Sequence, residues 1–389
     1  TLGLAFYVCS NGAAALALRS DVLGQPLGVI TDFEVAYGAR WRVQDRDSDL
    51  ISPGNGGTRS NDNGNIDDGN LNYDVGPVAN MFKADAEITL IWGNWGAFVR
   101  AYAFYDYENE RRDRARTDLS SEALEQVGSD AQVLDAYLSA RFDPKGMPLQ
   151  LRLGRQVISW GESRFFPADS TNVANPFNLP LFQLPTGQAK DLRLPVGMLW
   201  GSLQLSPDFA IEGYYQYEWN EHILPARGTF FSTSDVVTPG STFAQSGPFP
   251  DQGTNVDAAL GLPPGTVGFV PNWYQVPRIS SDKPSDHGQY GISLRMLAPK
   301  LNDTSFHLLF ANYHSKVPGI GAISPSLQTY LDYSLQGIAA KSAELQGAGV
   351  APEIANTAAQ RIQFNEYLTN TRYLTEYSED IRMLGLTMN

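Results

Sequence analysis

The chain has 389 residues, 42% of them hydrophobic, with a formal net charge of −14, four histidines and one cysteine. Phosphate backbones are bound by clustered Lys and Arg, so this charge argues against a nucleic-acid partner. With Cys9 as its single cysteine, the sequence offers neither an internal disulfide nor a cysteine-based zinc site.

The N-terminal stretch is apolar and ends in small residues. Ala15-Leu16-Ala17 fits the A-x-A pattern that precedes a signal-peptide cleavage site, although no basic residue comes before it. We therefore expect residues 1–17 to be a signal-peptide remnant or an N-terminal segment, with an ordinary apolar strand or helix as the alternative.

Residues 31–43 alternate cleanly between apolar and polar side chains, which is typical of a strand with one apolar and one polar face. The apolar face carries Phe33, Val35 and Trp41, and the polar face carries Arg40 and Arg42. The pattern recurs along the chain, and we predict ten strands at 31–43, 81–92, 95–107, 132–142, 147–157, 195–206, 208–219, 287–298, 304–315 and 379–389. In the fourth strand it places Leu134 and Leu138 on the apolar face.

The connections between these strands alternate strictly between short and long. The short ones are 93–96, 143–146, 206–208 and 299–303, and the long ones are 44–80, 108–131, 158–194, 220–286 and 316–378. Transmembrane β-barrels have short periplasmic turns and long extracellular loops. The alternative, a secreted β-sandwich or β-helix with one solvated face, does not explain this alternation. The predicted fold is therefore an all-β transmembrane antiparallel β-barrel over residues 18–389, with at least ten strands.

Two further expectations concern the barrel's ends. The chain stops within a strand-like run, so we expect more strands in the full protein and a barrel that is C-terminally incomplete here. Good helix formers in 335–346 and 352–371 predict short helices on the extracellular loops.

In a barrel, the apolar face of each strand meets lipid and the polar face lines the lumen. We expect charged lumen residues to form a ladder that stabilises the wall and sets the field in the pore: Arg40, Arg42, Asp85, Glu87, Arg100, Arg141, Arg152, Glu212 and Arg295. Aromatic residues at strand ends should form interfacial girdles: Trp41, Trp92, Trp95, Tyr105, Tyr107 and Trp219.

The long loops are unusually aromatic, and such side chains should fold into the barrel mouth. We predict an apolar throat that binds a hydrophobic small molecule, lined by Trp160, Phe165, Phe166, Phe177, Phe243, Trp273 and Tyr274. For any one of these residues, packing on neighbouring loops without a ligand is an equal alternative.

Other site chemistry is less supported. Asp62, Asp67 and Asp68 lie in a loop rich in oxygen ligands and form a weak calcium candidate, but the EF-hand spacing fails and a solvated turn cluster is favoured. No nucleophile elbow or phosphate loop occurs, so we predict no catalytic residues, no enzyme activity and no cofactor.

Three stretches, 65–76, 151–163 and 172–178, together with 194–219, resemble a large family of Gram-negative outer-membrane proteins that carries only a domain-of-unknown-function label. The resemblance implies a role related to that of the long-chain fatty-acid channels, with hydrophobic ligands such as lipids, fatty acids or sterol-like molecules. It also implies a periplasmic protein and an inner-membrane efflux-type transporter as partners, in addition to outer-membrane lipid.

The function expected from the sequence is therefore an outer-membrane channel for hydrophobic compounds. A general porin is one alternative, but it would have more hydrophilic loops and a charged constriction. A structural or adhesive barrel whose loops bind a partner is the other.

Overall fold

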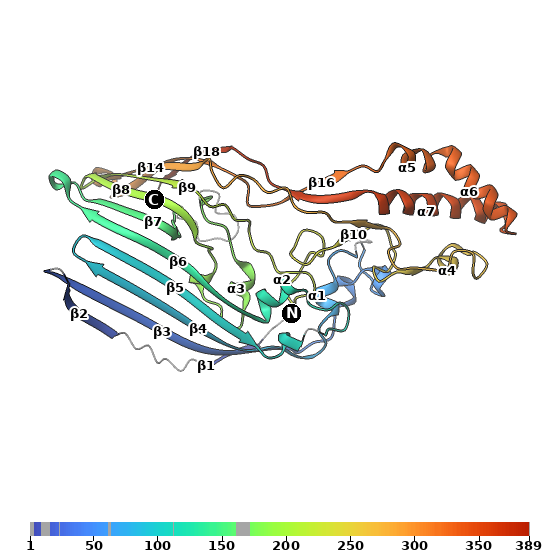
Figure 1. Cartoon of the computed structure of the whole chain (residues 1–389), viewed down its shortest axis with the longest axis horizontal. Helices are drawn as coiled ribbons and strands as arrows, with labels where there is room; N and C mark the ends of the chain where they lie inside the picture. The colour runs from blue at the N-terminus through green and yellow to red at the C-terminus, as the bar shows by residue number, and fades with distance from the viewer. Residues whose placement is uncertain are drawn as a thin grey trace.

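The computed structural model describes residues 4–8, 16–22, 24–60, 64–111, 113–160 and 172–388. Its main feature is an antiparallel sheet in which ten strands follow one another in chain order (Figure 1). They are β3 (Gln25–Arg42), β4 (Gly76–Trp92), β5 (Trp95–Asp106), β6 (Ser129–Phe142), β7 (Leu149–Gln156), β8 (Val196–Ser206), β9 (Phe209–Gln216), β14 (Gln289–Ala298), β15 (Thr304–Tyr313) and β18 (Ile381–Met388). Each coincides with a predicted strand, so the ten-strand prediction is confirmed.

Two shorter strands extend the sheet beyond β3. β1 (Leu4–Val8) pairs with the second half of β3, and β2 (Leu16–Val22) pairs with its first half. The predicted N-terminal segment 1–17 therefore contributes β-structure at this edge.

The predicted closure into a barrel is not found. The strand order runs from the β1/β2 edge to β18, and within the described residues β18 pairs with β15 alone. The alternation of side chains is a property of each strand by itself, whereas closure depends on strand number, tilt and shear together. The sequence pattern could therefore predict the strands without predicting how the sheet ends.

The alternation of short and long connections is confirmed. Two residues join β4 to β5, and Gly93 in this turn has a φ of +57°, a conformation that glycine adopts without strain. All the long connections leave the opposite ends of the strands. The sheet thus has a turn end and a loop end.

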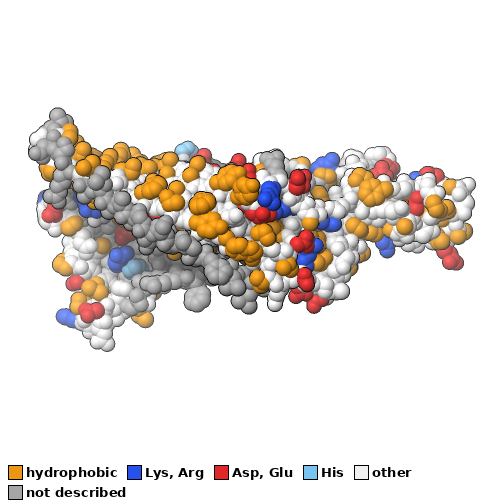
Figure 2. Space-filling model, turned by 90° about the horizontal axis from the view of Figure 1, so that it is seen from below, with side chains coloured by type: hydrophobic (Ala, Val, Ile, Leu, Met, Phe, Trp, Pro, Cys, Tyr) orange, Lys and Arg blue, Asp and Glu red, His pale blue; other side chains and the backbone are white. Residues whose placement is uncertain are grey.

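The two faces of the sheet differ as the alternation predicts. The outward face exposes large apolar side chains on every strand from β3 to β18, among them Phe82, Leu138 and Leu384. Lys83 and Arg100, on the inner face of β4 and β5, are buried. On the surface seen in Figure 2, hydrophobic side chains cover much of the sheet, and charged side chains gather where the strands give way to the loops.

The outward placement of Leu134 is wrong. The register of β5 and β6 shifts between Val99 and Ala101, so that two residues of β6, Leu134 and Asp135, stand opposite Arg100. This bulge turns Leu134 inward, where it is 3% exposed and packs with Tyr102. Beyond the bulge the predicted facing holds, and Leu138 is 61% exposed.

The predicted aromatic girdles are partly formed. Trp41, Trp95, Tyr105 and Tyr107 are exposed at strand ends. Trp219 is not part of a girdle: it is buried, its ring contacts Tyr377, and its indole N–H donates to the Ser315 carbonyl. The long loops at this end of the sheet cover its ring.

The long loops build an arm that projects from the loop end of the sheet (Figure 1). It contains the ribbon of β16 (Gly319–Ile323) and β17 (Arg372–Glu376) and the helices α5 (Leu327–Asp332), α6 (Leu335–Gly347) and α7 (Pro352–Asn370). The two helices predicted here, α6 and α7, are confirmed. α7 begins with Pro352 and Glu353, which suit the first turn of a helix.

Other loop elements are short: α1 (Asp68–Leu71), α2 (Ser121–Val127), α3 (Leu179–Gln183), α4 (Val256–Leu260), β10 (Phe243–Gln245), β11 (Thr254–Asn255), β12 (Phe269–Val270) and β13 (Gln275–Pro277). In the part of the chain that the structure describes, no helix combines the length and apolar character needed to cross a membrane.

Candidate functional site

The inner face of the sheet is covered by residues 172–195, which we call the plug. The plug contains α3, which begins at Asn178, whose side chain accepts a hydrogen bond from the Leu181 N–H. Asn175 is buried and bonds to the Gln156 and Leu194 carbonyls at 2.9 and 3.0 Å, which ties the plug to β7. Leu181, Leu184 and Leu194 pack with apolar residues of β4, β5 and β6.

Buried ion pairs anchor the plug to the sheet. Asp191 of the plug lies 2.6 Å from the Lys83 ammonium and 3.5 Å from the Arg100 guanidinium. Lys83 also contacts Asp85 at 3.2 Å, and Arg100 contacts Asp135 at 2.7 Å. We call these five residues the plug anchor. Asp85 and Asp135 offset part of the cost of burying Lys83 and Arg100 from the sheet itself, and Asp191 adds to this only while the plug stays in place.

The nine residues of the predicted charge ladder all belong to the inner face by strand register, but they lie in four separate groups. Glu87 pairs with Lys190 of the plug at 2.8 Å, beside the plug anchor that includes Asp85 and Arg100. Glu212 and Arg295 lie 3.5 Å apart across β9 and β14. The remaining four arginines, Arg40, Arg42, Arg141 and Arg152, lie in two other parts of the inner face.

Arg141 and Arg152 line a cavity of about 370 Å³ near the turn end, whose lining contains no carboxylate. Arg152 also stacks over the rings of Tyr137 and Trp200 at 5.4 and 4.7 Å. At the loop end, Arg40 donates to the Gln183 carbonyl at 2.7 Å, and Arg42 donates to the carbonyls of Asn70 and Tyr73.

Phe230 and Phe231 meet these last two arginines. The Arg40 guanidinium lies 4.6 Å from the Phe231 ring centre, and Arg42 lies 6.0 Å from that of Phe230. The two rings contact each other edge to face at 5.1 Å, and Phe230 also contacts Tyr73. Cation–π contacts of this kind stabilise the rings in place.

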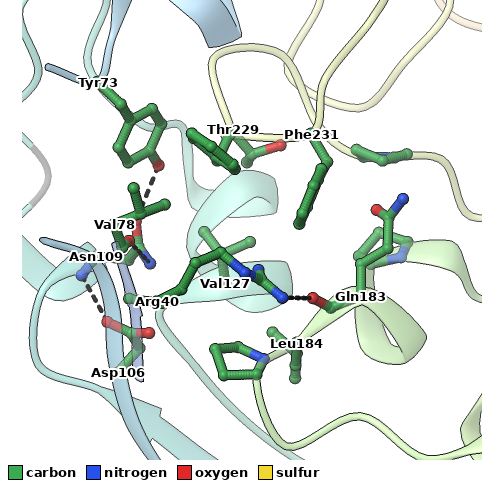
Figure 3. A pocket seen from close by; sticks show the side chains of 15 residues that line it. Arg40, Tyr73, Val78, Asp106, Asn109, Val127, Gln183, Leu184, Thr229 and Phe231 are labelled. Atoms are coloured by element: carbon green, nitrogen blue, oxygen red, sulfur yellow. Dashed lines mark hydrogen bonds between the residues drawn. The ribbon is translucent and has the colours of Figure 1, made fainter. Parts of the chain in front are cut away.

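Two cavities share Phe230 and Phe231 in their linings. The inner cavity, shown in Figure 3, is about 30 Å³ and lies between the loop ends of β3–β5, the plug and the 225–231 loop, with Arg40 pointing to Gln183 across it. The outer cavity is about 420 Å³ and is lined by Arg42, Leu50, Arg59, Ile66, Asn70, Phe230, Phe231, Ser232 and Thr233. The phenylalanine pair is therefore the wall between the two cavities.

The five predicted throat residues that the structure describes do not form one lining, although Trp273 and Tyr274 contact each other. Trp160 is buried against Tyr214 on the inner face and donates to Glu212 at 3.1 Å. Phe177 stacks on His222 within the plug region. Trp273 and Tyr274 are buried with Phe249 at the base of the arm, and Phe243 lies under Arg227. Phe165 and Phe166 lie outside the described residues.

The weak calcium candidate becomes part of a larger charge cluster. Asp67 and Asp68 lie with Asp251 in one group of fully buried carboxylates, and Asp62 lies outside the described residues. Arg227 contacts Asp68 at 2.6 Å, and Arg116 contacts both Asp68 and Asp251. We call this cluster, with Asp235, the loop hub, because its members come from three different long loops.

Burial shifts the acidity of the loop hub. It raises the pKa of Asp67, and together with the charge of Asp68 it raises the pKa of Asp235 to about 8. Asp235 therefore carries a proton at neutral pH, which lowers the repulsion among the four carboxyl groups. Two guanidinium groups and one proton supply the positive charge that a metal ion would otherwise provide.

Two hydrogen bonds hold the N-terminal end of the plug. His222 accepts a hydrogen bond from the Phe177 N–H on Nδ1, and Lys316 donates to the Val173 carbonyl at 2.7 Å. Burial lowers the pKa of Lys316 to about 7, and burial with the charge of Lys316 lowers the pKa of His222 to about 4. The histidine is thus neutral, as its acceptor role at Nδ1 requires.

The sequence predicts that the aromatic long loops fold inward, but it does not select Lys83, Asp191 or the Phe230–Phe231 pair as site residues. The alternation in residues 81–92 places Lys83 on the polar face with Asp85 and Glu87, and that signal alone could select it as a buried cation. Asp191 and the two phenylalanines lie on loops, where no residue period indicates which side chains meet.

A family model described as "Protein of unknown function (DUF1302)" matches residues 1–389. This match confirms the resemblance drawn from 65–76, 151–163 and 172–178. No curated protein and no solved structure matches the chain.

Proposed function

The chain belongs to the DUF1302 family over residues 1–389, and from this premise we propose that it is an outer-membrane channel for hydrophobic compounds such as lipids, fatty acids or sterol-like molecules. The observation that carries the proposal is the contrast between the exposed apolar face of the sheet and its charged inner face, which the plug covers. Lipid accepts apolar side chains and is a poor solvent for charges, so a membrane-spanning sheet needs this division.

In this proposal the strands cross the Gram-negative outer membrane as part of a closed barrel. Closure requires strands that pair with β18 and with the β1/β2 edge, because a bilayer leaves no backbone polar group unpaired. The long loops and the arm extend outside the cell, and the turn end faces the periplasm. A periplasmic protein and an inner-membrane efflux-type transporter would meet the channel at that turn end.

The membrane placement is tested with two leucine variants. Leu138→Arg puts a charge on the exposed apolar face. It should destabilise the protein folded in liposomes, reducing its free energy of unfolding by about 2–4 kcal/mol. Leu301→Arg, in the turn between β14 and β15, is the matched control and should change it little. Equal effects of the two substitutions in a urea titration would contradict the placement.

The transport role is tested in cells whose outer membrane is intact. Cells that produce the protein should take up the hydrophobic dye N-phenylnaphthylamine faster than cells with an empty vector, and proteoliposomes should not swell in a small sugar. Rapid swelling in the sugar without faster dye uptake would replace this role with that of a general porin.

The arm favours a second candidate, a barrel whose loops bind a partner. Leu327 and Leu335, at the starts of α5 and α6, are 73% and 87% exposed, which is unusual for leucine in a solvated loop. Deletion of 319–376 should abolish adhesion and leave dye uptake in place if the arm serves such a role.

A further inference from the structure

The outer cavity has an unusual charge for this chain. Its lining contains two arginines, Arg42 and Arg59, and no carboxylate, although the chain as a whole carries a net charge of −14. Arg42 is already engaged by the carbonyls of Asn70 and Tyr73. Arg59 is half-buried and forms no ion pair within the described residues, so its guanidinium is the donor left for a ligand.

The lining also contains four large apolar side chains. Leu50, Ile66, Phe230 and Phe231 face the cavity, and its volume of about 420 Å³ lies within the range of small-molecule sites. The two phenylalanines are held by Arg40, Arg42 and Tyr73, so this apolar wall is formed before any ligand arrives. A cavity lined by both apolar side chains and a cationic donor suits a molecule with an apolar body and an acidic group.

We propose that the outer cavity binds an amphiphile with an anionic head group, with the head on Arg59 and the apolar body against Phe230 and Phe231. This deepens the proposed function and rests on it for the statement that such a molecule is also transported. Behind the phenylalanine pair lies the inner cavity, which at about 30 Å³ is too small for such a body. The phenylalanine pair therefore acts as a gate. Either the pair alone or the pair together with the plug has to move before the ligand passes inward.

The test compares two probes of the same chain length, decanoate and decanol, at pH 7.5 and below their aggregation concentrations. Binding to the full chain in amphipol is measured by equilibrium dialysis, with protein-free amphipol as the reference. Wild type should bind decanoate saturably and at least about tenfold more tightly than decanol. Arg59→Gln should bring decanoate to within about twofold of decanol and leave decanol unchanged, since a charged contact of this kind is worth about tenfold in affinity.

The apolar wall is tested with the double variant Phe230→Ala and Phe231→Ala, which should weaken both probes by at least about tenfold. Arg111→Gln, an exposed arginine on another loop, is the control and should change neither probe. If the double variant misfolds, Arg59→Gln still decides, because Arg59 anchors no other residue in the described part of the chain.

Three results would overturn the site: no saturable binding of decanoate, decanoate binding unaffected by Arg59→Gln, or equal weakening of both probes by that change. The dye-uptake experiment separates this inference from the channel role. Selective decanoate binding without faster dye uptake would contradict the channel role and support the binding site. Faster dye uptake without decanoate binding would support the channel role and contradict the binding site.

Discussion

The plug anchor and the loop hub are both buried clusters of acidic and basic side chains, but they are built on different supports. In the plug anchor, four of the five residues lie on β4, β5 and β6, and Asp191 alone comes from a loop. In the loop hub, Asp67, Asp68, Asp235, Asp251, Arg116 and Arg227 all come from the long loops. Strands joined by hydrogen bonds cannot move apart when a charge loses its partner, whereas loops can shift and admit water.

The clusters also differ in charge. The plug anchor has three carboxylates for two cations, and the loop hub has four carboxyl groups for two guanidinium groups. In the loop hub, the proton on Asp235 lowers the repulsion among the four carboxyl groups, because the pKa of Asp235 is raised to about 8. We therefore expect the plug anchor to be sensitive to the loss of a side chain and the loop hub to be sensitive to pH.

The largest effect is expected for Asp191→Ala. It removes the 2.6 Å contact of Lys83, while Asp85 and Asp135 still face the two cations, so we expect a cost near the lower end of the about 3–5 kcal/mol for breaking a buried pair. We expect faster proteolysis within the plug and a lower free energy of unfolding in urea.

Glu87→Ala is the matched control, because its pair with Lys190 is partly exposed and should contribute less than about 1 kcal/mol. If the two variants unfold at the same urea concentration, the plug is held by its leucines and not by the plug anchor.

A smaller effect is expected for Arg227→Ala in the loop hub. The change removes the 2.6 Å contact with Asp68, but the loops can relax, so we expect a cost of about 2 kcal/mol. Hydrogen exchange should become faster at residues 67–72 and 229–235 and stay unchanged in β4. A loss as large as that of Asp191→Ala would show that the loops are as rigid as the strands.

The pH dependence of the loop hub is smaller again and has a definite sign. Asp235 is protonated in the folded state up to about pH 8 and ionised in the unfolded state above about pH 4, so the folded loop hub binds the extra proton between these values. The stability of the loop hub should therefore fall as pH rises through this window. The equilibrium constant for its opening should increase by at most about tenfold per pH unit.

Hydrogen exchange at residues 67–72, corrected for intrinsic rates, should therefore show easier opening at pH 8 than at pH 6. Asp235→Asn should remove the difference. His222 has the opposite sign, because its pKa is lowered to about 4, so the Phe177 contact should weaken as pH falls from about 6.5 toward 4. A loop hub that opens more easily at pH 6 would contradict the proton on Asp235.

The same contrast explains what could be predicted from the sequence. All ten strands and the facing of Lys83, Asp85 and Arg100 follow from an alternation that each strand carries in its own residues. Leu134 was misplaced because a bulge depends on the neighbouring strand. The throat aromatics were grouped by composition, but Trp160 and Trp273 pack in different clusters because loop folding decides which side chains meet. The acidic composition of the loop selects Asp67 and Asp68, yet the arginine partners of Asp68 lie 48 or more residues away in other loops.

The smallest expected effect is that of calcium on the loop hub. Calcium needs six to eight oxygen ligands, but Asp67 already accepts hydrogen bonds from Ser52 and Asn55, and Asp68 contacts both Arg116 and Arg227. Ten millimolar CaCl2 should therefore leave the thermal unfolding temperature where a sodium chloride solution of equal ionic strength leaves it. The double variant Arg116→Gln and Arg227→Gln removes both guanidinium groups from the carboxylates, and calcium should then raise the unfolding temperature. A site occupied at one hundred times its dissociation constant adds about 2.7 kcal/mol, which a thermal scan resolves. A calcium-dependent rise in the wild type would mean that the metal displaces the arginines, and the loop hub would then be a calcium site after all.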